Sequence, residues 1–149
     1  MAYYMRFFAT GDAPVTLPSV EEALRANDSA YALTDLTGDP PSGALLTYAG
    51  EQYAQIELET PPDPEEIAEL IEEIDDSGSP RKNREMVKRA LAEAGMVVVI
   101  QVLSGGREWD ATTARLDPLW DWLHANHQGL GQADGAGYYH GDKRVLRTE

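Results

Sequence analysis

The chain has 149 residues, 42% of them hydrophobic, and its 26 Asp and Glu against 12 Lys and Arg give a formal net charge of −14 at pH 7. This hydrophobic content excludes an intrinsically disordered chain, and the length suits one domain. The absence of cysteine excludes disulfides, thiolate metal sites and a cysteine nucleophile, and no apolar run is long enough to span a membrane. We therefore expect one cytoplasmic globular domain covering residues 1–149.

The first part of the chain reads as strands interrupted by one short helix. Ser19 followed by Glu22 has the form of a capping box and predicts a helix over residues 20–25. In the last of the strands, Glu57 and Glu59 alternate with apolar residues and are expected to point away from the core. Apolar runs bounded by turn residues predict these strands over residues 3–9, 31–36, 44–49 and 52–59.

Two helices are predicted next, over residues 64–76 and 79–95, each with a proline at its start and a glycine at or beyond its end. The first is amphipathic at a period of 3.6 residues. Its apolar stripe consists of Ile67, Leu70, Ile71 and Ile74. Its opposite side consists of Glu65, Glu66, Glu69, Glu72 and Glu73.

The nearly continuous apolar run 96–103 predicts a central strand covered on both faces. A helix follows over 117–128, and strands over 138–140 and 143–148 predict a C-terminal hairpin. The glycine-rich segment 129–135 leaves a helix rather than a strand, which is the wrong context for a nucleotide loop, and is expected to be a flexible connection. The predicted fold is a single α/β (α+β) domain with a central mixed sheet of about five to seven strands, flanked by three or four helices.

Across the turn between the two middle helices, the charged side chains change from negative to positive. Asp75 and Asp76 end one helix and Arg81 and Lys82 start the next, so each pair is placed unfavourably on its own helix dipole. The simpler interpretation is an ion-pair clamp across the turn. The alternative is an anion site at the start of the second helix. The residues of that candidate site are Ser79, Arg81, Lys82 and Arg84.

The C-terminal part holds the residues that could carry acid–base or ligand chemistry. Asp121 and His124 lie three residues apart, as do His124 and His127, and this spacing permits them to share a ligand on one side of a helix. His140 in the hairpin completes the candidate set. The spacing is weakly specific, and the favoured interpretation of these residues is packing and surface roles, with no metal or cofactor required.

The charge distribution carries the main functional hypothesis. Residues 26–80 contain 14 of the 26 acids and no Lys or Arg, so the remaining 12 acids balance the 12 bases. Salt adaptation would spread the acids over the whole chain, which is not observed. A nucleic-acid partner is disfavoured because the field would repel phosphates. We expect a non-enzymatic interaction protein of the inhibitor, immunity or adaptor type that binds a basic protein partner.

The expected contacts of this partner are the glutamates of the 64–76 helix and Trp122, an indole placed away from the apolar stripe of its own helix. A homo-oligomer is also compatible with the sequence, and membrane association is not expected. We expect the acids to be divided between two sides of the sheet, with Glu57 and Glu59 opposite the helix glutamates. The alternative function is a small metal- or anion-binding enzyme that uses the C-terminal His/Asp cluster.

Overall fold

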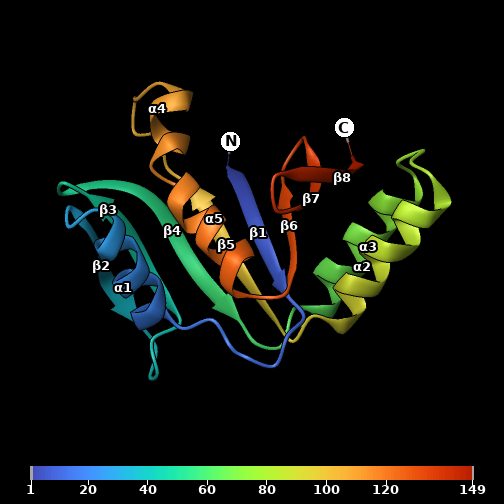
Figure 1. The fold of residues 1–149 in the computed structure, drawn as a ribbon, viewed down its shortest axis with the longest axis horizontal. Helices are drawn as coiled ribbons and strands as arrows, with labels where there is room; N and C mark the ends of the chain where they lie inside the picture. Colours follow the sequence, from blue (N-terminus) through green and yellow to red (C-terminus); the bar gives the residue numbers. More distant parts are fainter. Residues whose placement is uncertain (1, 149) are drawn as a thin grey trace.

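A computed structural model describes residues 2–148, which form one eight-stranded antiparallel sheet with helices on both faces (Figure 1). The strands are β1 (Tyr3–Ala9), β2 (Tyr31–Thr37), β3 (Gly43–Tyr48), β4 (Glu51–Glu59), β5 (Met96–Val102), β6 (Gly129–Ala133), β7 (Gly137–His140) and β8 (Lys143–Arg147). The helices are α1 (Leu17–Asn27), α2 (Pro64–Asp75), α3 (Arg81–Glu93), α4 (Trp109–Ala114) and α5 (Asp117–Asn126). The strand order is β2-β3-β4-β5-β1-β6-β7-β8.

The sheet separates two hydrophobic cores. Alternate residues of one strand enter opposite cores: Phe7 of β1 packs under α1 and α5, and the adjacent Phe8 packs under α2 and α3. Val98 and Val97 of β5 are divided in the same way. This confirms the prediction that the apolar run around β5 is a central strand covered on both faces.

The α+β class and the C-terminal hairpin are confirmed, but the mixed sheet of five to seven strands is wrong. All seven strand pairings of the described residues are antiparallel. One reason is the connection between β4 and β5, which consists of two helices rather than one. A single crossover helix delivers a parallel neighbour, whereas the pair α2 and α3 returns the chain to the end of the sheet it left (Figure 1).

Three local predictions need correction. The first helix begins earlier than expected, because Thr16 is its N-cap and shares a capping box with Ser19. The segment Trp109–Ala114 forms α4, which was not predicted. The expected flexible connection is instead β6, paired on one side with β1 and on the other with β7. Within residues 2–148, no helix combines the length and apolar character that crossing a membrane requires.

Candidate functional site

The acids of β4 and α2 lie on the same side of the sheet. Ile56 and Leu58 of β4 pack into the core under α1 and α5, so the alternating Glu57 and Glu59 face the side that carries α2. Burial, and after it the carboxylates of Glu66 and Asp63, raise the pKa of Glu59, so these groups are electrostatic neighbours. The expected division of the acids between two sides of the sheet is therefore wrong.

We call this region the acidic surface. Five of its members are exposed residues of α2 or its N-cap, and α2 has no basic residue in its last turn. Its residues are Glu57, Glu59, Asp63, Glu65, Glu69, Glu72 and Glu73. Asp63 caps α2 through a hydrogen bond from the Glu65 amide at 3.0 Å.

Glu66, which the sequence grouped with the partner-binding glutamates, is paired inside the protein. Its Oε1 accepts a hydrogen bond from Arg6 Nε at 2.8 Å. Arg6 Nη1 also donates to Gln132 Oε1 at 2.8 Å and to Asp134 Oδ1 at 3.1 Å. The Arg6 side chain is 15% exposed, so this network fastens α2 to the centre of the sheet. The acidic surface thus loses one member to a structural role.

The turn between α2 and α3 holds the candidate anion site. The ion pair across it joins Asp75 to Lys88 at 2.8 Å. The clamp interpretation had instead paired Asp75 and Asp76 with Arg81 and Lys82. Ser79 and Arg84 are occupied locally, because Arg84 Nε donates to the Ser79 carbonyl at 2.9 Å and the Ser79 hydroxyl donates to the Arg147 carbonyl. Arg81 and Lys82 are exposed at the start of α3.

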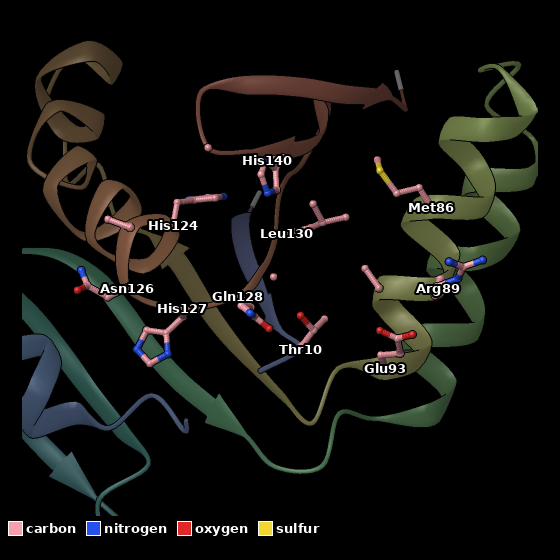
Figure 2. A pocket seen from close by; sticks show the side chains of 14 residues that line it. Thr10, Met86, Arg89, Glu93, His124, Asn126, His127, Gln128, Leu130 and His140 are labelled. Carbon is pink, nitrogen blue, oxygen red and sulfur yellow. The ribbon is translucent and has the colours of Figure 1, made fainter. Parts of the chain in front are cut away.

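A hollow lies between α3 and the C-terminal end of α5 (Figure 2). We call it the histidine pocket. It has a volume of about 710 Å³, with His124 and His127 on one wall, Arg89 and Glu93 on the other, and His140 at the hairpin end. The structure thus brings together three of the four candidate residues of the C-terminal cluster.

The fourth candidate, Asp121, does not line the pocket and is exposed on α5. Burial, and after it Asp121, raise the pKa of Asp117. No group of three or more metal-ligating side chains arranged to hold an ion is found among residues 2–148.

His124 is the most constrained residue of the pocket. Its Nδ1 lies 2.9 Å from the Trp120 carbonyl, and its ring contacts Phe7 and Trp120 with centroid separations of 5.0 and 4.8 Å. A carbonyl only accepts, so Nδ1 carries the proton and Nε2 of the neutral ring is an acceptor. Nε2 is buried and has no hydrogen-bond partner among the described residues.

Trp122, the expected anchor, is half-buried and packs against the core under α5, with its ring 5.3 Å from His127. The more exposed indole is Trp109 of α4, 44% exposed and edge-on to Tyr3. Sequence reasoning also missed Arg6 and Met86. An arginine between apolar residues of a predicted strand was the available signal for Arg6.

Comparison of the chain with protein-family models, with curated proteins and with solved structures finds no match in any of the three.

Proposed function

We propose that this protein is a non-catalytic interaction module, of the inhibitor, immunity or adaptor type, that binds a basic partner protein in the cytoplasm through its acidic surface. One observation supports the proposal above the others. The acids of β4 and α2, which lie near one another in the sequence, also lie on one side of the sheet. After burial, the carboxylates of Glu66, Asp63 and Glu57 raise the pKa of Glu59.

Clustered charge of one sign acts on a partner before contact. It steers association and discriminates against partners of the same sign, while each exposed ion pair adds only about 0–1 kcal/mol. A cluster that repels itself is also costly to the fold unless a partner neutralises it. The acidic surface therefore suits recognition of a basic protein better than it suits stability.

The test uses charge removal at exposed positions. The variant Glu65→Gln, Glu69→Gln, Glu72→Gln removes three charges from the acidic surface, and these side chains are exposed. Its matched control removes three exposed charges elsewhere, at Asp12, Glu22 and Asp110. Both variants and the unaltered protein are used as baits in lysate of the native host, and captured proteins are identified by mass spectrometry.

The proposal expects a basic protein that is retained by the unaltered protein and by the control, and that is lost from the acidic-surface variant. The captured protein is then purified and titrated directly. Equal retention by all three baits, or binding that is unchanged between low and high salt, contradicts the proposal.

The alternative, an enzyme or anion-binding protein that uses the C-terminal cluster, has one observation in its favour. Three histidines line one pocket, and the buried Nε2 of His124 has no hydrogen-bond partner within residues 2–148. Asp121 lies outside the residues that line it, which leaves the histidines without the carboxylate that the sequence suggested as their partner. Turnover of any substrate that is abolished by His124→Gln would favour this alternative.

A further inference from the structure

The histidine pocket contains an open strand edge. β6 pairs with β1 along its whole length, from Gly129 to Ala133, but the register with β7 covers only Gly131 to Ala133. β7 leaves the sheet at the turn through Gly141, which lies at the pocket end. The first part of β6 therefore extends beyond its outer neighbour.

The hydrogen-bonding direction at this edge follows from the pairing with β1. The Thr10 amide donates to the Gln128 carbonyl at 2.9 Å, which directs the polar groups of Gln128 toward β1. In an antiparallel strand the directions alternate from residue to residue. The N–H and C=O of Gly129 therefore point to the outer side, where β7 has turned away. A donor and an acceptor from one residue, side by side, match the main chain of an extended peptide.

His124 supplies a second acceptor in the same pocket. In the neutral ring the Trp120 carbonyl, 2.9 Å away, places the proton on Nδ1, which leaves Nε2 as an acceptor for a donor. A buried acceptor without a partner is unfavourable, and no described residue satisfies it. Figure 2 shows the His124 ring extending from α5 toward His140. Because Nε2 is buried, a ligand that donates to it must displace the side chains that cover it.

The charge of the ligand follows from the remaining groups. The Glu93 carboxylate adds an acceptor, and the C-terminal end of α5 favours a positive charge. Arg89 is the opposing charge, and the chain as a whole carries −14. Met86, 43% exposed, provides an apolar contact on the α3 wall.

We propose that the histidine pocket binds a short extended segment of the partner protein, which pairs through its main chain with Gly129 and donates a hydrogen bond from a lysine or arginine to His124 Nε2. This inference rests on the proposed function for the existence of a basic protein partner. It adds the segment by which the partner is held once the acidic surface has attracted it.

The direct test is a titration of ¹⁵N-labelled full-length protein with the blocked peptide acetyl-Val-Lys-Val-Lys-Val-amide, followed by NMR. The largest saturable shifts are expected at the Gly129 amide and at Nε2 of His124. One control peptide carries glutamates in place of the lysines and so lacks the side-chain donors. The other carries N-methylated peptide bonds and so lacks the main-chain N–H donors. Each is expected to bind at least about tenfold more weakly.

Three results overturn the inference. These are the absence of shifts at Gly129 and His124, equal shifts for all three peptides, and complete reproduction of the shifts by butylamine, which would identify a site for small amines. The variant Ala125→Trp fills the pocket from an exposed position of α5 and is expected to abolish the shifts. Ala26→Trp, at an exposed position of α1, is the control and leaves them unchanged.

The same variants separate this inference from the proposed function. If the acidic-surface variant loses the captured partner and Ala125→Trp retains it, the acidic surface is correct and the pocket assignment fails. If Ala125→Trp loses the partner and the acidic-surface variant retains it, the pocket holds the partner without the steering surface. Retention by both contradicts both proposals.

Discussion

Gly131 is the position at which one added methyl group should disturb the fold most specifically. It lies in β6 directly under α5, paired with Phe7 of β1. A Cβ at this position would lie 2.3 Å from Trp120 Cη2, 2.4 Å from Trp120 Cζ2 and 2.8 Å from His124 Cε1. The φ angle of Gly131 is not in the left-handed region, so the expected penalty is steric rather than conformational.

The size of the penalty follows from overpacking. To reach normal contact the Trp120 ring must move by about 1 Å and the His124 ring by about half as much, and such insertions cost about 1–3 kcal/mol. For a chain of this length, each kcal/mol lowers Tm by about 2–4 °C, so Gly131→Ala is expected to lower Tm by about 2–12 °C. Urea denaturation followed by circular dichroism and fluorescence measures the free energy of unfolding directly.

Two companion variants make the result interpretable. A Cβ at Gly95 meets nothing within 4 Å, so Gly95→Ala is expected to be neutral or slightly stabilising. In a Trp120→Leu background the larger part of the obstruction is removed, and the effect of Gly131→Ala is expected to fall by at least about half. A Gly131→Ala protein as stable as Gly95→Ala would refute the packing of α5 on β6 described above.

Three further predictions concern stability. Burial raises the pKa of Glu59, so its ionised form costs stability at neutral pH and the cost disappears as the pH falls; Glu59→Gln should raise Tm at pH 7 and have a smaller effect at pH 4. A hydrogen bond from Tyr48 lowers the pKa of Asp28, which contributes stability that is lost as the pH falls through the acid range; Tyr48→Phe should flatten the dependence of Tm on pH between about 3 and 5. Ile74 is 0% exposed in the core under α2, so Ile74→Ala should lower the free energy of unfolding by about 2–5 kcal/mol in urea denaturation, with a smaller loss for the half-buried Ile71.

Elements with a strong hydrophobic period were predictable from the sequence. The helices α2 and α5 and the strands β1 and β5 lie within two residues of the expected bounds, because each has a clear apolar pattern and clear end signals. β6 was not predictable in this way. Its glycines are required by residues that are distant in the sequence: a Cβ at Gly129 would lie 2.0 Å from the Phe8 carbonyl oxygen, and Gly131 faces Trp120.

The candidate site was predictable in its residues but not in its arrangement. Alternation along β4 correctly separated Glu57 and Glu59 from the core, but no local pattern states which side of a sheet a later helix will cover. His124 and His127 were neighbours by helical spacing alone. His140 joins them because β7 pairs with β6. That pairing was not predictable, because the glycine-rich sequence of β6 is typical of a loop.

The central claim is that the acidic surface attracts a basic partner, and the association rate constant tests it most directly. Stopped-flow measurements with the captured and purified partner compare the unaltered protein with the variant Glu65→Gln, Glu69→Gln, Glu72→Gln at several salt concentrations. We expect the unaltered protein to associate about tenfold faster at low salt than the variant, with the difference disappearing near 1 M salt, where the Debye length is about 3 Å. Equal rate constants and equal salt dependence for the two proteins would contradict the claim.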